Sequence, residues 1–114
     1  MSNMQRRRYE RAPFFADVSL RALPKGTVSP GRSIDLSLGG VGLVTGAVFT
    51  PGQEVSIVFH LPGTGPRKRI DVEVTGRVVN LNADVDANRI GVEFLEPLGP
   101  SRGPELVERL QNMN

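Results

Sequence analysis

Residues 34–44 read Ile-Asp-Leu-Ser-Leu-Gly-Gly-Val-Gly-Leu-Val, which predicts two short strands joined by a very tight turn at Gly39 and Gly40. Successive side chains of a strand point to opposite faces, so Asp35 and Ser37 are expected side by side, opposite the apolar residues. The glycine pair permits a bend with positive φ and lets another molecule approach the backbone closely. We therefore expect half of a ligand site here; the simpler alternative is a strand that ends in a solvated glycine turn.

Alternating segments on both sides of this stretch predict the rest of the fold. Residues 24–31 and the polar residues 80–88 are expected to form loops between strands. Gly76 interrupts the apolar set of its strand and indicates a bulge or a sharp bend. Strands are expected at residues 16–22, 33–38, 41–44, 55–61, 70–78 and 90–94. Their number and spacing predict an all-β fold, a six-stranded antiparallel barrel.

The end of the chain changes its hydrophobic period. A Gly-Pro pair at residues 103–104 is typical of a helix start with proline at the first helical position. Leu106, Val107, Leu110 and Met113 then fall on one side, which predicts a short C-terminal helix. Because so short a helix is not stable alone, we expect it to pack on the open end or edge of the barrel rather than on a partner.

Composition indicates one intracellular globular domain. The chain has 114 residues, 39% of them hydrophobic, and no cysteine. It therefore has no disulfide, no thiolate zinc site and no cysteine nucleophile, which is compatible with a reducing compartment. The first residues lead into arginines rather than an apolar signal segment, and no apolar run approaches membrane-spanning length. We expect a soluble, cytoplasmic protein without membrane insertion.

The net charge of +2 is unevenly distributed along the chain. Four arginines and one glutamate give residues 1–12 a charge of +3 (4 − 1), so residues 13–114 carry −1 (10 − 11). We therefore divide the chain into a basic N-terminal arm, residues 1–12, and a body, residues 13–114. One basic cluster on a nearly neutral body suits a compact anionic ligand better than a nucleic-acid polymer or a membrane. Arginine in place of lysine favours bidentate recognition and stacking.

The sequence reveals no catalytic or metal-binding constellation. His60 is the only histidine and lies on the polar side of its strand, so it is expected to be a surface residue. Asp84 and Asp86 lack the further ligands that calcium requires. The chain contains neither a phosphate-binding P-loop motif nor a serine-nucleophile elbow. The pattern favours a binding module over an enzyme, with no catalytic residue, no metal and no cofactor.

Two polar motifs lie in a fixed order along the chain. The arm contains R-x-x-x-R at residues 7–11, and the central stretch contains D-x-S-x-x-G at residues 35–40. Further short motifs follow them, among them G-R-V-V at 76–79 and I-G-V-E-F at 90–94. Together these motifs resemble the PilZ domain family, from about residue 5 to residue 111. The resemblance implies a six-stranded antiparallel barrel with a C-terminal helix that serves as a bacterial receptor for cyclic di-GMP.

The resemblance also implies which residues bind the ligand. An arginine pairs with guanine O6 and N7, clamps a phosphate or stacks on a purine, and a carboxylate accepts the donors of the guanine Watson–Crick edge. Our hypothesis for Arg6, which precedes the first motif, is that it helps to hold a second, stacked nucleotide. The expected cyclic di-GMP site comprises Arg6, Arg7, Arg11, Asp35, Ser37, Gly39 and Gly40.

The position of the arginines predicts how the signal is passed on. Residues 1–12 have no apolar periodicity and repel one another, so they are expected to be mobile without ligand. A doubly anionic ligand would relieve the repulsion and close the arm over the nucleotide. Ligand-induced ordering of the arm would then create a surface that an unidentified downstream protein can recognise.

Two other functions stay open on the sequence alone. A PilZ-like protein that binds no nucleotide would act only as a protein adaptor, although both motifs are intact here. A small barrel can also bind RNA or single-stranded DNA, but such barrels interleave aromatic and basic residues across a sheet face. The chain has six aromatic residues, and Tyr9 is the only one inside the basic cluster.

Overall fold

A computed structural model describes residues 10–63, 65–66, 68–83 and 86–112. Within these ranges the chain forms seven strands and one helix. In chain order they are β1 (Ala12–Pro13), β2 (Asp17–Ala22), β3 (Val28–Leu36), β4 (Gly40–Thr45), β5 (Glu54–Pro62), β6 (Arg69–Ala83), β7 (Asn88–Phe94) and α2 (Pro104–Asn112).

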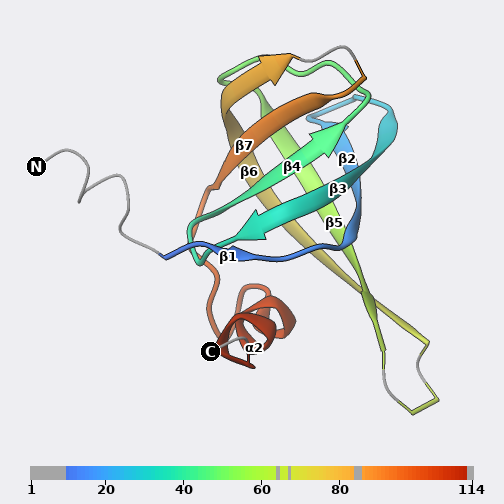
Figure 1. The fold of residues 1–114 in the computed structure, drawn as a ribbon, viewed down its shortest axis with the longest axis vertical. Helices are drawn as coiled ribbons and strands as arrows, with labels where there is room; N and C mark the ends of the chain where they lie inside the picture. The colour runs from blue at the N-terminus through green and yellow to red at the C-terminus, as the bar shows by residue number, and fades with distance from the viewer. Residues whose placement is uncertain (1–9, 64, 67, 84–85, 113–114) are drawn as a thin grey trace, which may run out of the picture.

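Six of the strands close into an antiparallel barrel (Figure 1). Their order around the barrel is β3-β2-β5-β6-β7-β4, and the pairing of β4 with β3 closes the circle. The two-residue strand β1 pairs with the end of β3 that extends beyond β2, placing Ala12 opposite Leu36 and Pro13 opposite Asp35. The predicted six-stranded antiparallel barrel is therefore confirmed, with one short extra strand.

Alternation along the strands fills the interior of the barrel. Leu20, Ile57 and Phe59 are completely buried, and the residues between them on the same strands face outward. Phe14, which follows β1, packs against Phe59 with the ring centroids 6.3 Å apart. This contact attaches the segment between β1 and β2 to the core.

Two segments that we expected to be loops belong to strands. β3 begins at Val28, so residues 28–31 pair with β2. Pro30 is tolerated there because β4 pairs with β3 only from Gly31 onward, which leaves β2 as the single neighbour at Pro30. Residues 80–83 likewise continue β6 alongside β7. The prediction missed this part of β6 because it belongs to the polar segment 80–88. This end of the strand can be polar because it is mostly exposed and covers little of the core.

The irregularity of β6 lies beyond Gly76. The register of β6 against β7 shifts between Val78 and Asn80. Gly76 itself pairs regularly with both neighbouring strands. A Cβ at Gly76 would lie 2.5 Å from Cγ1 of Val92, so close packing, and not a bulge, explains this glycine.

Helix α2 covers one end of the barrel (Figure 1). It begins at Pro104, as predicted, and Leu106 is completely buried in the core. Val107 and Leu110 pack partly against the same core, which confirms the expected packing on the barrel. Met113 lies outside the described residues. In the described ranges, no helix combines the length and the apolar character that crossing a membrane requires.

A buried serine ties the segment between β1 and β2 to β3. The Ser33 hydroxyl donates to the carbonyl oxygen of Phe14 (2.7 Å) and accepts from the N–H of Ala16 (2.9 Å). The Ser33 N–H also donates to the carbonyl oxygen of Ala16 (2.9 Å). These bonds fix the connection between the arm and the barrel against the strand that carries Asp35.

Candidate functional site

The central stretch forms the tight turn between β3 and β4. β3 ends at Leu36, two residues earlier than predicted, so Ser37 lies in the turn and not beside Asp35 on a strand face. The Ser37 hydroxyl accepts hydrogen bonds from the N–H groups of Gly39 and Gly40, both at 3.1 Å. Ser37 is 4% exposed. Its hydroxyl therefore holds the turn, a role that the strand pattern did not reveal.

Gly40 of the turn is required for a reason other than positive φ. In the described part of the chain positive φ occurs at other glycines, so the expected left-handed bend at Gly39 and Gly40 is wrong. A Cβ on Gly40 would collide with the carbonyl oxygen of Val92. The carbonyl oxygen of Gly39 accepts a hydrogen bond from the Phe94 N–H (2.9 Å). Close contact with β7 thus explains Gly40 and holds the turn in place.

The two predicted motifs meet at Asp35. Its Oδ1 accepts a hydrogen bond from the Gly42 N–H (3.0 Å) and another from Nη1 of Arg11 (3.2 Å). The Asp35 side chain is 33% exposed and the Arg11 side chain 57% exposed. The backbone therefore holds the carboxylate, while both charged groups stay accessible to a ligand.

Strand β1 brings the arm to this point. β1 runs along the end of β3 (Figure 1), and Pro13 pairs with Asp35, so the chain brings Arg11 next to the Asp35 carboxylate. The other predicted arginines, Arg6 and Arg7, lie outside the described residues. Of the predicted site residues, the described structure thus brings Arg11 and Asp35 into contact, and it places Ser37, Gly39 and Gly40 in the adjoining turn.

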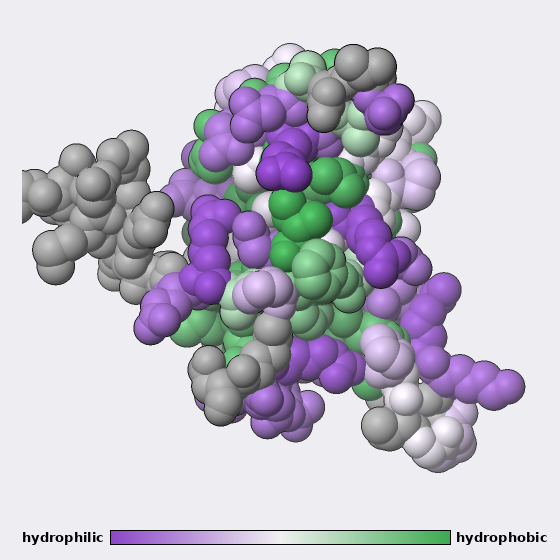
Figure 2. Space-filling model, viewed as in Figure 1, coloured by the Kyte–Doolittle hydropathy of each residue, from purple (hydrophilic) through white to green (hydrophobic). Residues whose placement is uncertain are grey.

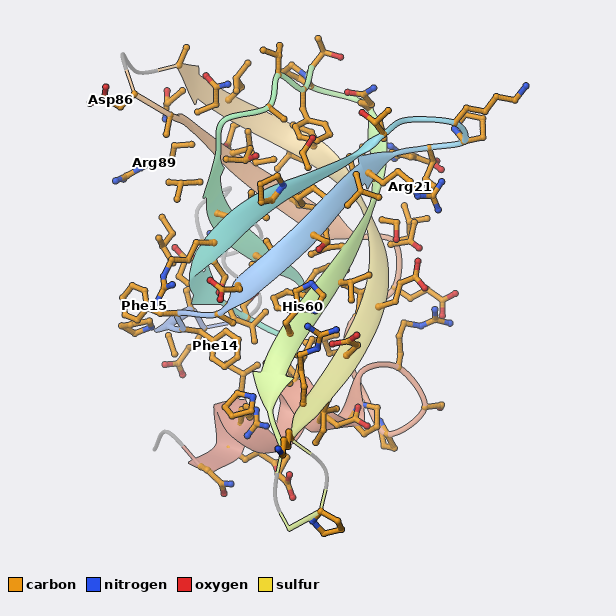
Figure 3. All side chains as sticks on the ribbon, turned by 90° about the vertical axis from the view of Figure 1, so that its right-hand side faces the viewer. Phe14, Phe15, Arg21, His60, Asp86 and Arg89 are labelled. Carbon is orange, nitrogen blue, oxygen red and sulfur yellow. The ribbon has the colours of Figure 1, made fainter. Side chains whose placement is uncertain are left out.

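The outer face of β3, β4 and β7 forms a shallow platform next to Asp35. Gly42 of β4 and Gly91 of β7 face outward and are directly paired. Figure 2 shows a small apolar patch in the middle of this face, ringed by hydrophilic side chains. Arg89 of β7 and Phe15 project from the same side of the molecule (Figure 3), and Phe15 is 65% exposed. The platform offers a carboxylate, a guanidinium and an exposed ring around two glycines that are themselves buried, an arrangement that suits a flat, polar ligand.

A hydrogen-bonded row of side chains crosses the outside of β2, β5 and β6. His60 Nε2 lies 2.7 Å from Oγ of Ser19, and His60 Nδ1 lies 2.9 Å from Oδ1 of Asp71. Arg69 Nε is 3.0 Å from the same Asp71 oxygen. The hydrogen bond from His60, aided by the Arg69 charge, holds the pKa of Asp71 below its usual range. His60 lies on the outer face of the barrel, as expected of a surface residue, but it is half-buried and both of its ring nitrogens have hydrogen-bond partners.

The row contains the residue types of a hydrolase triad but lies in the middle of a sheet. β2 pairs with strands on both sides, so the backbone N–H groups near Ser19 are engaged in the sheet. An acyl-transfer site needs such groups for its oxyanion. We therefore interpret the row as structural. It was invisible in the sequence because only the strand register sets His60 opposite Asp71.

His60 also lines a pocket of about 320 Å³ between β2, the end of β5 and α2. Its walls include Phe14, Arg32 and Arg109. None of the predicted ligand residues that the structure describes lines this pocket. The described residues of the predicted site therefore lie outside this pocket, while Phe15 lines the pocket and also projects from the side of the molecule that carries the platform.

Comparisons with known proteins agree with this architecture. The family model of the PilZ domain matches residues 5–110. No curated protein matches the sequence at a significant level.

Three solved structures share the fold at low sequence identity. The inhibitor of motility MotI (DgrA) of Bacillus subtilis superposes with a TM-score of 0.69 at 20% identity, over 95% of this chain and 53% of MotI, so the chain spans about half of that protein. The PilZ domain of Escherichia coli YcgR with c-di-GMP gives a TM-score of 0.59 at 19% identity, covering 96% and 88% of the two chains. The PilZ domain of CeSA from a cellulose-synthesizing bacterium gives 0.63 at 16% identity, covering 91% and 97%.

Proposed function

Because the chain belongs to the PilZ domain family, we propose that it is a cytoplasmic, non-catalytic receptor for cyclic di-GMP that passes the signal to a protein partner. The observation that carries the proposal is the contact between Arg11 and Asp35, which joins one residue from each ligand motif. The YcgR domain, whose structure includes c-di-GMP, and MotI, an inhibitor of motility, lend it support as proteins of the same fold.

Asp35 is placed to bind a guanine without moving. The Gly42 N–H holds Oδ1, which orients the carboxylate and directs Oδ2 toward donors of a ligand. The N1–H and N2–H groups of guanine are donors of this kind, and a carboxylate accepts both. Asp35 would therefore select guanine over adenine, whose N1 is an acceptor.

Arg11 supplies the second half of the recognition. Its guanidinium is more than half exposed, so exchanging the Asp35 oxygen for a ligand group costs little. The guanidinium then pairs with guanine O6 and N7, or with a phosphate, in bidentate geometry. Arg7, four residues earlier in the same motif, binds whichever of the phosphate and the base Arg11 does not contact.

The arm transmits the binding event. Its charge of +3 opposes the binding of further cations and favours a ligand with two phosphodiester groups. Binding closes the part of the arm that precedes Arg11 over the nucleotide, and the combined surface of arm and ligand is what the partner recognises. Arg6 takes part by holding a second, stacked nucleotide.

Calorimetric titration of the full chain with cyclic di-GMP tests the proposal. We expect saturable binding, and we expect the Asp35→Ala variant to bind about ten- to a hundredfold more weakly, because one bidentate base contact contributes roughly 1–3 kcal/mol. Cyclic di-AMP, which has the same charge, is the matched ligand control and is expected to bind much more weakly.

A single-stranded oligonucleotide completes the test. A polyanion releases counterions, so its affinity falls steeply with salt, whereas a small dianion gives a shallow slope. Tight, steeply salt-dependent oligonucleotide binding without cyclic di-GMP binding would identify a nucleic-acid barrel. Binding of neither ligand would leave a protein adaptor.

A further inference from the structure

A single row of residues crosses the platform in register. Asp35 of β3 is opposite Gly42 of β4, Gly42 is opposite Gly91 of β7, and Gly91 is opposite Asn80 of β6. The two outer members are polar and the two inner members have no side chain. The row therefore has a carboxylate at one end, an amide at the other and two buried glycines between them.

The side chains of Asp35 and Asn80 lie over the two glycines, on the outer face of the barrel. A Cβ on Gly42 would lie 2.8 Å from Oδ1 of Asp35, and a Cβ on Gly91 would lie 2.8 Å from Oδ1 and 2.9 Å from Nδ2 of Asn80. Because Gly42 and Gly91 are directly paired across β4 and β7, the carboxylate and the amide lie over neighbouring positions of the platform.

The bulge of β6 is what brings Asn80 into this row. The register against β7 shifts between Val78 and Asn80. Val78 is 1% exposed and faces the core, so regular alternation would turn Asn80 inward as well. The extra residue, Val79, reverses the parity and places Asn80, which is exposed, on the outer face.

We propose that Asn80 is a second base-reading residue, which binds the edge of the same guanine whose Watson–Crick donors Asp35 accepts. Guanine has donors at N1 and N2 and acceptors at O6 and N7. A carboxylate satisfies only the donors, since it has no proton to give, whereas the Asn80 amide donates to O6 or N7. This inference rests on the proposed function and extends it by one residue outside both ligand motifs.

Calorimetric titration with cyclic di-GMP of wild type and three single variants tests the inference. Asn80→Ala is expected to weaken binding about tenfold, and Asn80→Asp more than that, because a carboxylate repels O6 and the phosphodiesters. Gly91→Ala keeps the asparagine but displaces its amide, so it is expected to reproduce the Asn80→Ala loss. Asn82→Ala, on the same strand and one outward position further along, is the matched control and is expected to bind within twofold of wild type.

The outcomes separate this inference from the proposed function. If wild type binds cyclic di-GMP, Asp35→Ala weakens the binding and Asn80→Ala stays within twofold of wild type, only the role of Asn80 is overturned. Absence of wild-type binding would overturn both. Thermal unfolding of each variant shows whether the barrel is intact, and equal losses for Asn80→Ala and Asn82→Ala would also contradict a specific role for Asn80.

Discussion

Asp35 shows how one side chain serves both the fold and the proposed ligand site. One of its oxygens is held by the Gly42 N–H and contacts Arg11, yet a third of the side chain stays exposed. Ser37 is buried, and its hydroxyl accepts hydrogen bonds from the backbone N–H groups of the turn. At the level of single residues, the two polar groups of the D-x-S-x-x-G motif therefore have different roles: Asp35 stays accessible for the proposed ligand, and Ser37 shapes the loop.

The His60 contact gives a prediction for Asp71. The pKa of the Asp71 carboxyl is lowered chiefly by the hydrogen bond from His60. A lowered folded-state pKa means that this contribution to stability is complete above the ordinary aspartate pKa and is lost as the pH falls through the folded-state value. We expect His60→Ala to raise the pKa of Asp71 toward its ordinary value, as measured by carbon-13 NMR titration of the carboxyl group. An unchanged Asp71 titration in this variant would contradict the hydrogen-bonded row.

At the scale of elements, the connection from β1 to β2 depends on Ser33. Its buried hydroxyl bridges Phe14 and Ala16. Ser33→Ala leaves a buried carbonyl and a buried N–H with fewer partners, so we expect the free energy of unfolding to fall by about 1–3 kcal/mol. Urea denaturation measures this. The exposed Ser101→Ala is the control and is expected to change stability by less than about 0.5 kcal/mol; an equal effect of the two substitutions would show that the Ser33 bridge contributes nothing.

The elements differ in how far their sequences predict them. β5 and α2 were predictable because alternation and helical period each place apolar residues on one face. The start of β3 was missed because Pro30 and Gly31 look like turn residues, and only the position of β4 explains why a strand tolerates them. The bulge in β6 was assigned to Gly76 because local sequence marks a glycine, whereas the register with β7 sets the actual position.

Some residues of the candidate site were predictable from the sequence and others were not. The resemblance to the PilZ family that the motifs carry was sufficient to connect Arg11 with Asp35, and the structure brings them into contact. Asn80 carries no local signal, because its outward position depends on a register shift and its proximity to Gly91 on pairing between β6 and β7. Contacts that depend on how strands align across the barrel were thus beyond the reach of a single sequence.

At the scale of the whole molecule, the concentration of positive charge in the N-terminal arm predicts that ligand binding orders the arm more than the barrel. Cyclic di-GMP is expected to close the arm through Arg7 and Arg11, while the closed barrel has no free edge to rearrange. Hydrogen exchange with and without ligand measures this: protection should rise in residues 5–11, which precede β1, and change little within β5 and β6. An arm with equal protection in both states would mean a preformed site and would exclude the proposed switch.

The central claim is that the arm and the D-x-S-x-x-G turn form one ligand site through Arg11 and Asp35. Arg11→Ala is a clean probe because an exposed ion pair contributes only about 0–1 kcal/mol to stability, so the variant is expected to fold normally. Arg102→Ala, which removes an exposed ion pair with Glu96, is the matched control.

The most direct measurement is calorimetric titration of wild type, Arg11→Ala and Arg102→Ala with cyclic di-GMP under identical buffer conditions. The proposed site predicts that Arg11→Ala weakens binding about ten- to a hundredfold while Arg102→Ala binds like wild type. Wild-type affinity in the Arg11→Ala variant would contradict it.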